Sequence, residues 1–476
     1  MKFATDELIG VLSQFNPWWR GEPISDLPTW KRAAWHELRS WVINPPAQRA
    51  VLLAGARQIG KTTLLLQTIR QLLEDGVAPG NILYATLDHP MLKLAGIEAV
   101  LKAWREGHPK GDGVEYLFLD EAQFIRDSGT WVKHQVDFEK QRRIIFTGSA
   151  LRLQEMDLES GVGRWHVIRL STLSFYEYIR IKNLTLPRLR SVGSLANLFE
   201  LSRSEMLQTQ DIGQRYAGHF REYLLRGGFP QAAQVESITQ AQRLLREDIV
   251  DKVLKRDMTA LFGVRRVLEL EQTFLFLCMH SGGPLDFTAL CSSLEVKRPT
   301  AQSFIELLEA VHLIYKLAPF GYGKEVLRAR FKIYLADAAI APAVLLKGRA
   351  LFQDPAAMGV AVETAVFKHL FARYYREQVR FTYWRGKKDH EVDLVAQIGD
   401  QLIPFEIKNR TSPAETAKLR GLAEFCQRYK IPRAYLVTRE MKDFGLVTSG
   451  DFGGTPVMQV PAALLCYWMG ESETAS

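Results

Sequence analysis

Cysteine is scarce in this sequence, and long apolar runs are missing. The four cysteines in 476 residues lie far apart and show no metal-ligand spacing; they are Cys278, Cys291, Cys426 and Cys466. This pattern argues against a cysteine-ligated metal site, and we expect reduced thiols in the core of a cytoplasmic protein. No uncharged run approaches the roughly 18 residues that span a membrane. The N-terminus lacks the apolar core of a signal peptide, and the chain shows no low-complexity tract or repeat.

Bulk composition describes a large folded protein with a basic charge balance. At 476 residues the chain has room for about three domains of roughly 150 residues each. Its 47% hydrophobic and 24% charged residues match a soluble protein with an ample core. The formal net charge of +8 and the sequence pI of about 9.1 are compatible with a nucleic-acid partner. They do not establish one, because many solvated surfaces are basic.

A glycine-rich stretch between an apolar run and a helical pattern predicts a phosphate-binding loop. The predicted nucleotide-binding residues are Gly55, Ala56, Arg57, Gln58, Ile59, Gly60, Lys61, Thr62 and Thr63. Strand, glycine loop and helix N-terminus in this order direct backbone N–H groups at phosphate oxygens. We expect Lys61 to reach the β- and γ-phosphates of ATP and the Thr62 hydroxyl to hold Mg²⁺. A glycine turn before a core helix is the alternative, but it leaves the Lys-Thr pair unexplained.

Two acids follow a second apolar run. Residues 116–119 predict a central parallel strand that is buried on both faces. Asp120 then lies at the carboxyl end of this strand, where open α/β sheets bind ligands. We expect Asp120 to hold Mg²⁺ through water and Glu121 to polarise the attacking water. The pattern is typical of a hydrolysing ATPase, and a strand that merely ends in two acids is the weaker alternative.

Polar residues near these motifs are further candidates for nucleotide contact. The next apolar strand, 143–146, is followed by Thr147 and Ser149, and either of them can sense the γ-phosphate from the adjacent strand. Arg32 and Arg39 lie on a helical pattern before the loop. They are candidates for contact with the nucleotide, with a solvated helix face as the favoured alternative.

Together these motifs resemble a family of prokaryotic AAA-type (ASCE P-loop) ATPases that carry a C-terminal domain of unknown function. The matching segments are Gly55–Thr62, Leu119–Gln123, Thr147–Ser149, Gly163–Arg164, Leu173–Glu177 and Tyr223–Pro230. The resemblance continues to the C-terminus, so it covers most of the chain and implies its architecture. Ala56 departs from the proline that the family usually has there, which is a mild change in the loop. By resemblance, Arg164 stabilises charge on the transferred phosphoryl group, within the chain or from a neighbour in an oligomer. A surface arginine is the alternative.

The region after the ATPase predicts helices and then a small helix-and-strand unit. Residues 181–262 are mainly helical and are expected to form a lid and connector. Residues 263–347 predict three helices and two strands in the order of a winged helix, whose third helix can enter the DNA major groove. The candidates for contact with phosphate or base edges are Lys297, Arg298 and Gln302. Acidic residues further along that helix favour the alternative of a packing module.

Acidic residues and a lysine near the C-terminus predict a second chemistry. Glu363 lies on a predicted helix, Asp393 on a strand, and Glu406 and Lys408 on one face of the next strand. This order resembles the PD-(D/E)xK nuclease fold. Asp393 and Glu406 can share one Mg²⁺, with Glu363 as a third carboxylate, while Lys408 orients a water or the phosphate. A salt-bridged pair and a nuclease fold without activity are the alternatives.

Aromatic and basic residues accompany this second site. They are Tyr383, Trp384, Arg385, Lys387 and Lys388. The combination suits a nucleic-acid backbone, although a solvated Lys-Lys turn would look the same.

The sequence therefore predicts an α/β fold of five parts. They are an N-terminal arm and helix at 1–45, a P-loop AAA-type ATPase core with a parallel sheet at 46–180, a helical lid or connector at 181–262, a winged helix at 263–347 and a restriction-nuclease-like domain at 348–470. The predicted function is ATP hydrolysis with Mg²⁺ that controls action on nucleic acid, with DNA favoured and metal-dependent cleavage as a second activity. The alternative is a STAND-like ATP switch whose C-terminal fold only binds nucleic acid or protein. A homo-oligomer and a protein partner stay open, and no membrane partner is expected.

Overall fold

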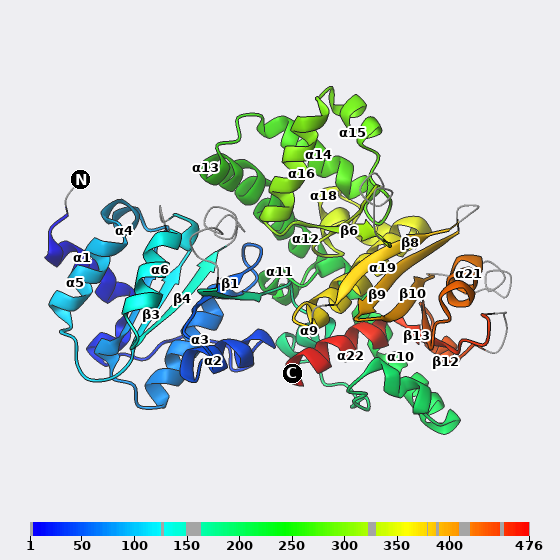
Figure 1. The fold of residues 1–476 in the computed structure, drawn as a ribbon, viewed down its shortest axis with the longest axis horizontal. Helices are drawn as coiled ribbons and strands as arrows, with labels where there is room; N and C mark the ends of the chain where they lie inside the picture. Colours follow the sequence, from blue (N-terminus) through cyan, green and yellow to red (C-terminus); the bar gives the residue numbers. More distant parts are fainter. Residues whose placement is uncertain are drawn as a thin grey trace. The chain divides into compact units, whose positions relative to one another are not determined.

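The computed structural model describes residues 3–124, 128–148, 163–321, 330–377, 379–386, 390–408, 419–447 and 452–475. These residues form a mixed α/β structure (Figure 1). Contacts divide it into two compact units. The first is Met1–Leu170 together with Ala310–His312, and the second is Ser171–Glu309 together with Leu313–Ser476. Each unit is built on its own sheet.

The first unit contains a five-stranded parallel sheet in the order β2-β3-β4-β1-β5. Its strands are β1 (Ala50–Ala54), β2 (Ile82–Thr86), β3 (Glu115–Asp120), β4 (Arg142–Gly148) and β5 (Trp165–Arg169). β1 and β3 are buried along their whole lengths, as expected for central strands that are covered on both faces. Ala54 pairs with Gly148, and Thr86 pairs with Asp120. The carboxyl ends of β1 to β4 therefore lie at one edge of the sheet.

Helices cover this sheet. They are α1 (Thr5–Phe15), α2 (Ala34–Ile43), α3 (Lys61–Glu74), α4 (Pro90–Ala95), α5 (Ile97–Gly107) and α6 (Ser128–Phe138). Helices α1 and α5 lie side by side (Figure 1). Leu12 of α1, Trp104 of α5 and Phe146 of β4 belong to one buried core, so the N-terminal arm is part of the ATPase-like unit.

The second unit begins with helices, as the sequence predicts. They are α9 (Phe175–Ile181), α10 (Arg203–Arg226), α11 (Pro230–Gln234), α12 (Ile238–Arg246), the π-helix η5 (Glu247–Asp257) and α13 (Met258–Phe262). Helix α10 ends at Gly227, whose φ is +75° and where a Cβ atom would lie 2.7 Å from Oδ1 of Asp337. The turn at this glycine packs against a segment more than one hundred residues downstream.

Three helices and an antiparallel strand pair come next, in the predicted order. They are α14 (Val267–His280), α15 (Phe287–Leu294), α16 (Arg298–Ala310), β6 (Ile314–Pro319) and β7 (Lys332–Leu335). After the short helix α18 (Ile340–Val344), the long helix α19 (Pro355–Tyr374) leads to the C-terminal strands.

The C-terminal strands extend the same sheet. They are β8 (Arg380–Arg385), β9 (Glu391–Ile398), β10 (Gln401–Ile407), β11 (Ala434–Thr438), β12 (Gly445–Leu446) and β13 (Val457–Pro461). The order is β12-β13-β11-β10-β9-β8-β6-β7. Ala318 of β6 pairs with Thr382 of β8 in parallel. One sheet therefore runs through the two ranges, 263–347 and 348–470, that the sequence assigns to separate domains.

The two remaining C-terminal helices are α21 (Arg420–Tyr429) and α22 (Ala462–Ala475). Helix α22, drawn in red, lies beside α9 and α19 (Figure 1). All four cysteines are free thiols. Cys278, Cys426 and Cys466 are buried, as predicted, whereas Cys291 is half-buried. Among the described residues, no helix has the length and apolar character needed to cross a membrane.

Candidate functional site

The phosphate-binding loop connects β1 to α3, and its conformation requires glycine at two positions, Gly55 and Gly60. A Cβ atom at Gly55 would lie 2.3 Å from the carbonyl oxygen of Leu170 and 2.5 Å from Cδ1 of Ile59. Gly60 directly precedes α3 and has a φ of +94°, in the left-handed region that favours glycine. The predicted sequence of strand, glycine loop and helix N-terminus is therefore confirmed.

The Lys61 side chain folds back over this loop. It is 5% exposed, and its Nζ donates to the carbonyl oxygens of Gly55, at 2.9 Å, and Ala56, at 2.7 Å. Phosphate oxygens are stronger acceptors for an ammonium group than carbonyl oxygens are. Lys61 is thus held beside the loop by contacts that a phosphate group can replace.

Asp120, at the carboxyl end of β3, collects hydrogen bonds from hydroxyl groups. Its Oδ2 accepts from Oγ1 of Thr62 at 2.6 Å and from the Tyr84 hydroxyl at 2.9 Å. Its Oδ1 accepts from Oγ1 of Thr147. Burial, and then the charge of Asp120, raise the pKa of Tyr84, so this phenol stays protonated as a donor. The structure thus brings Thr62 and Asp120, the predicted Mg²⁺ pair, into direct contact.

Glu121 has an uncommon backbone conformation for a residue with a side chain. Its φ is +55°, and its backbone N–H donates to Oγ1 of Thr147 at 3.0 Å. Its carboxylate accepts a hydrogen bond from Nε2 of Gln123. Left-handed conformations of non-glycine residues gather at functional sites, where the surrounding structure holds them in place. The predicted base therefore stands next to Asp120 in a fixed orientation.

The other predicted residues of this site have varied surroundings. Arg57, Gln58 and Thr63 are half-buried and Ile59 is buried. Thr147 contacts both acids, whereas Ser149, the second candidate for sensing the γ-phosphate, lies outside the described residues. Thr147 and Ser149 therefore both stay candidates for sensing the γ-phosphate.

Two of the arginines have partners that the sequence does not reveal. Arg164 makes a two-pronged ion pair with Asp137, with Nε at 2.9 Å from Oδ1 and Nη2 at 3.0 Å from Oδ2. Its role toward the phosphoryl group stays a prediction. Arg39 is partly exposed, and its Nη2 lies 3.5 Å from Oδ2 of Asp75.

The favoured expectation of a solvated face is wrong for Arg32. This side chain is buried, and its Nη1 donates to the carbonyl oxygen of Ile59 at 2.9 Å. The reason is that Arg32 precedes α2, in a segment that packs on α3, where Nε2 of Gln67 donates to the carbonyl oxygens of Pro28 and Trp30. Arg32 therefore stabilises the phosphate-binding loop through the backbone of Ile59.

A second cluster of charged residues lies in the second unit, around the side chain of Lys332. The Nζ atom of Lys332 is 2.5 Å from Oε1 of Glu391, 3.6 Å from Oδ1 of Asp393 and 3.7 Å from Oε1 of Glu363. The Tyr334 hydroxyl, on the same face of β7, donates to Oε1 of Glu363 at 2.5 Å. Strand β7 thus supplies a cation and a donor to carboxylates from α19 and β9.

Glu406 and Lys408 form the other half of this cluster. Their ion pair spans 2.6 Å from Nζ to Oε1, while Oε2 of Glu406 is buried without a hydrogen-bond partner among the described residues. Asp393 is tied to the same strand, because its Oδ2 accepts from the backbone N–H of Ile407 at 2.9 Å. The structure therefore brings together Glu363, Asp393, Glu406 and Lys408, as the sequence predicts.

Burial and mutual repulsion perturb the acids of this cluster. Burial, and then the charge of Asp393, raise the pKa of Glu363 to about 7 and that of Glu406 to about 8. Burial alone would lower the pKa of Lys332, but the charges of Glu363, Asp393 and Glu391 outweigh it and raise that pKa. The carboxylates stabilise the ammonium form of Lys332 more than burial destabilises it.

Sequence reasoning missed Lys332, Tyr334 and Glu391. The available signal was a lysine and a tyrosine two positions apart in an otherwise apolar strand, which places both on one face. The described residues contain no group of three or more His, Cys, Asp or Glu side chains arranged to hold a metal ion. Glu363, Asp393 and Glu406 as metal ligands therefore stay a prediction.

The predicted role of Tyr383 and Trp384 beside this site is wrong, because neither ring is available to stack on bases. Both side chains are 4% exposed. Trp384 packs edge-on against Phe425 at 5.4 Å between ring centroids, and the Tyr383 ring lies 5.4 Å from Nζ of Lys332. Alternation along β8 does not separate these two residues, because the sheet is covered on both faces. Arg385 is exposed, and Lys387 and Lys388 lie outside the described residues.

The predicted nucleic-acid contacts of the third helix are on the surface. Lys297, Arg298 and Gln302 are exposed at the start of α16, and the Arg298 guanidinium lies 4.9 Å from the centroid of the Phe287 ring. Exposure is compatible with contact to phosphate or bases, which remains a prediction.

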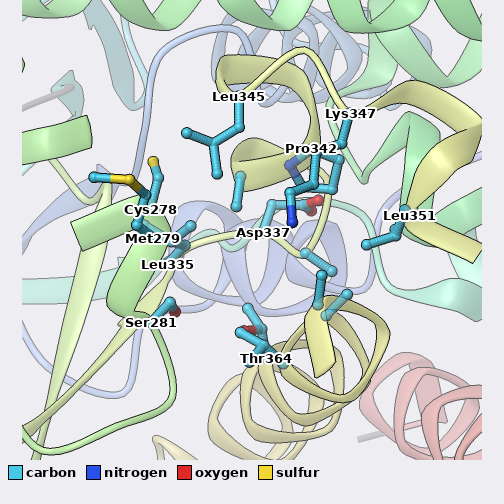
Figure 2. A pocket seen from close by; sticks show the side chains of 15 residues that line it. Cys278, Met279, Ser281, Leu335, Asp337, Pro342, Leu345, Lys347, Leu351 and Thr364 are labelled. Atoms are coloured by element: carbon cyan, nitrogen blue, oxygen red, sulfur yellow. The ribbon is translucent and has the colours of Figure 1, made fainter. Parts of the chain in front are cut away.

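A largely apolar cavity of about 390 Å³ lies near the charged cluster in the second unit. Figure 2 shows Cys278 and Met279 of α14, Pro342 of α18 and Thr364 of α19 around it. Leu335 of β7 also lines it, and this residue points away from the face that carries Tyr334 because side chains alternate along a strand. The cavity and the charged cluster therefore share β7 and α19.

Three family models match successive parts of the chain. Residues 47–179 match a model described as AAA domain. Residues 217–350 match a domain of unknown function (DUF8612), and residues 358–460 match another domain of unknown function (DUF4143). The first match coincides with the parallel sheet and the phosphate-binding loop.

Two similar proteins carry the name uncharacterized protein. An uncharacterized protein of Haemophilus influenzae is 27% identical over 383 residues, which cover 76% of this chain and 83% of that protein. An uncharacterized protein of Mycobacterium tuberculosis is 26% identical over 378 residues, which cover 78% of this chain and 73% of that protein.

Solved structures show weaker likeness. CDC6P from Pyrobaculum aerophilum matches with 14% identity and a TM-score of 0.28, covering 69% of this chain and 98% of that one. AMPPCP-bound DnaA from Aquifex aeolicus matches with 14% identity and a TM-score of 0.26, covering 60% and 89%. At these TM-scores neither likeness bears on function. The family match and the geometry of the loop support an AAA-type ATPase domain at residues 47–179.

Proposed function

We propose that this chain binds and hydrolyses ATP at the loop Gly55–Thr62 and uses the nucleotide cycle to control action on nucleic acid by its second unit. The observation that carries the first part is the 2.6 Å hydrogen bond between Thr62 and Asp120. It joins the residue after the loop lysine to the acid at the end of the buried strand β3, which is separated from β1 by β4 in the sheet. This is the pair that holds Mg²⁺ in P-loop ATPases.

The residues present fit Mg²⁺ and ATP. Hydroxyl and carboxylate oxygens are the ligands that Mg²⁺ prefers, and the loop leads into the N-terminus of α3, where backbone N–H groups bind phosphate. Thr62 would hold the ion directly and Asp120 through water. The bound ion would neutralise charge on the phosphates. Lys61 would bind the β- and γ-phosphates, and Glu121 would orient and polarise the attacking water.

Replacement of the loop lysine tests this proposal. Lys61→Ala removes the charge that binds the β- and γ-phosphates, so we expect loss of ATP binding in a fluorescent-nucleotide titration and loss of phosphate release. Lys102→Ala is the matched control, because Lys102 is 74% exposed on α5. ATP hydrolysis that survives Lys61→Ala would contradict the assignment.

The action on nucleic acid is supported by charge and by the second cluster. The chain has a net charge of +8, and Lys297 and Arg298 are exposed at the start of a helix that follows two others, as in a winged helix. Asp393, Glu406 and Lys408 lie together in the order of a PD-(D/E)xK nuclease. We favour DNA as the nucleic acid that this unit acts on, and the order of these residues makes cleavage of a phosphodiester the first candidate activity of this cluster.

A second candidate function is a STAND-like ATP switch whose C-terminal fold binds nucleic acid or protein without cleavage. The observation that favours it is the position of Lys332, which pairs with Glu363, Asp393 and Glu391. In this arrangement the carboxylates do not fit a metal ion, because an ammonium group already lies among them. No cleavage step is therefore assigned to a metal here.

Plasmid DNA distinguishes the two candidates. Purified protein would be incubated with supercoiled plasmid, Mg²⁺ or Mn²⁺, and ATP, with Asp393→Asn and Lys61→Ala alongside. Nicking that disappears in Asp393→Asn supports the nuclease. Salt-dependent DNA binding without nicking under any metal, with ATP hydrolysis intact, supports the switch. Absence of any salt-dependent binding to DNA or RNA would favour a protein partner instead.

A further inference from the structure

Lys332 is an unusual residue to find inside a sheet. It opens β7, which is the edge strand of the eight-stranded sheet, yet its side chain is only 2% exposed. Lysine is almost never fully buried unless its charge is paired. The strand also comes before the range 348–470 in which the sequence places the nuclease-like residues. The residue therefore enters the second site from a different part of the chain.

The surroundings of its ammonium group are negative on several sides. Glu391 and Asp393 come from β9 and Glu363 from α19, at 2.5, 3.6 and 3.7 Å respectively. The ring of Tyr383, on β8, lies 5.4 Å away, within the range in which a ring face attracts a cation. One ammonium group is thus shared by three carboxylates from two elements. Two of these carboxylates, Glu363 and Asp393, are predicted metal ligands.

A second observation concerns the carboxyl group of Glu406. Oε2 of Glu406 is buried and has no hydrogen-bond partner among the described residues, although Oε1 of the same carboxylate is paired with Lys408. A buried carboxylate oxygen without a partner is costly. Lys332 and Lys408 together therefore do not satisfy all the carboxylate oxygens of the cluster.

We propose that Lys332 is the resident cation of the second site: its ammonium group takes the place that a divalent ion needs among Glu363 and Asp393, so that an ion binds only when these contacts are given up. This inference rests on the proposed function, because it concerns the metal site predicted there. It assigns to Lys332 a positioning role, in which it holds the carboxylates together and lowers their affinity for metal.

The competing explanation is an ordinary buried ion pair. An ion pair that only stabilises the fold would leave metal affinity unchanged once the pair is removed as a whole. A resident cation makes a different prediction, because its removal opens the place to a divalent ion. The two explanations therefore separate on metal affinity rather than on stability.

The test measures Mn²⁺ binding to the full chain without nucleotide, by electron paramagnetic resonance of the free ion. The variants compared are Glu391→Gln and the double variant Lys332→Met with Glu391→Gln. The double variant removes the 2.5 Å pair as a neutral unit, so that Glu391 is not left charged without its partner. It keeps Glu363, Asp393, Glu406 and Lys408. Thermal unfolding of each variant checks that it folds.

We expect the double variant to bind Mn²⁺ more tightly than Glu391→Gln by about tenfold or more, within the usual range of coupling between two ligands. Adding Asp393→Asn to the double variant should abolish the gain, which places the ion at this cluster rather than at the phosphate-binding loop. Lys332→Arg, which keeps the charge, should bind Mn²⁺ as weakly as the wild type. Equal or weaker binding by the double variant would overturn the inference.

The plasmid assay on the same proteins separates this inference from the proposed function. If the double variant gains Mn²⁺ affinity while no protein nicks DNA, Lys332 is the resident cation and the proposed cleavage is wrong. If the wild type nicks DNA in a manner that depends on Asp393 while the double variant gains no affinity, the cleavage stands and the inference about Lys332 is wrong.

Discussion

The two charged sites of this protein hold their acids in opposite ways. In the first unit, Asp120 accepts hydrogen bonds from the hydroxyl groups of Thr62, Thr147 and Tyr84. Hydroxyl donors orient a carboxylate without neutralising it, so its charge is available to a cation. In the second unit, Glu363 and Asp393 surround the ammonium group of Lys332, which neutralises part of their charge within the protein.

The two arrangements give the sites different affinities for a cation. A carboxylate fixed by neutral donors is ready to bind Mg²⁺ with its nucleotide and to release it with the product. A carboxylate paired with an internal lysine binds a cation only in exchange for that pair, and breaking a buried pair is costly. We therefore expect the first site to act in every ATP cycle and the second to be the one whose activity is held back.

The largest expected effect is on ATP turnover. Glu121→Gln should lower the rate of phosphate release by about 100-fold or more, because a general base typically contributes that much, while nucleotide binding is retained. Asp393→Asn is the comparison and should leave ATP turnover near the wild-type rate. Normal hydrolysis by Glu121→Gln, followed in a coupled phosphate assay, would show that the base is assigned to the wrong residue.

The next effect compares the buried lysines of the two charged sites, Lys332 and Lys61. Lys332→Met leaves the carboxylates of its cluster without their cation, so we expect a loss of about 3–5 kcal/mol in the free energy of unfolding. Lys61→Met should cost less, because the partners that it leaves at Gly55 and Ala56 are neutral carbonyls. Urea unfolding followed by circular dichroism measures both. A Lys332→Met protein as stable as the wild type would mean that the cluster is not held by this residue.

A smaller effect concerns the space around the phosphate-binding loop. Gly55→Ala places a Cβ atom 2.3 Å from the carbonyl oxygen of Leu170, so the loop must shift, at a cost of about 1–3 kcal/mol. Nucleotide affinity should fall as well. Gly10→Ala on α1 is the control, because nothing lies within 4 Å of its new Cβ atom. Isothermal titration with an ATP analogue checks affinity, and unchanged binding by Gly55→Ala would show that the tight packing of Gly55 does not set the affinity for nucleotide.

The smallest effect is a pH dependence that comes from His369 in the second unit. Burial, and then the charge of Lys368, hold the pKa of His369 well below its usual 6.5. The ring is neutral in the fold, where Nε2 accepts from the backbone N–H of Phe175 at 2.8 Å. The unfolded chain therefore binds more protons as the pH falls through about 6.5, and stability is lost below that pH.

Between about pH 7 and pH 6, protonation of His369 in the unfolded chain should lower the free energy of unfolding by about 1 kcal/mol or less. Melting temperatures of the wild type and of His369→Asn across this range measure the difference in slope. If the two slopes agree, the ring is already protonated or exposed in the native protein, and the described burial of His369 is wrong.

Much of the first site is predictable because its parts are local in sequence. The loop Gly55–Thr62 and the acids Asp120 and Glu121 lie at ends of strands whose apolar runs predict them, and parallel pairing brings such ends to one edge. The sequence does not reveal Tyr84, because a tyrosine within a buried strand looks like any core residue. It also misplaces Arg32, whose burial depends on how the preceding segment packs on α3.

The second site is less predictable because it is assembled from distant segments. Glu363, Asp393, Glu406 and Lys408 follow a motif, and their meeting confirms the predicted strand order. Lys332 belongs to no such motif, and it reaches the cluster only because β6 pairs with β8 and carries β7 into the same sheet. That pairing is a long-range contact which periodicity along a single strand cannot specify.

The stoichiometry of Mn²⁺ in the presence of a non-hydrolysable ATP analogue tests this comparison most directly. Equilibrium dialysis of the wild type should find a single tightly bound Mn²⁺, which is lost in Asp120→Asn and unaffected by Asp393→Asn. That result is predicted if the first site is open to a cation and the second is held by Lys332. A second tightly bound ion in the wild type that disappears in Asp393→Asn would show that Lys332 does not keep a divalent ion out of the second site.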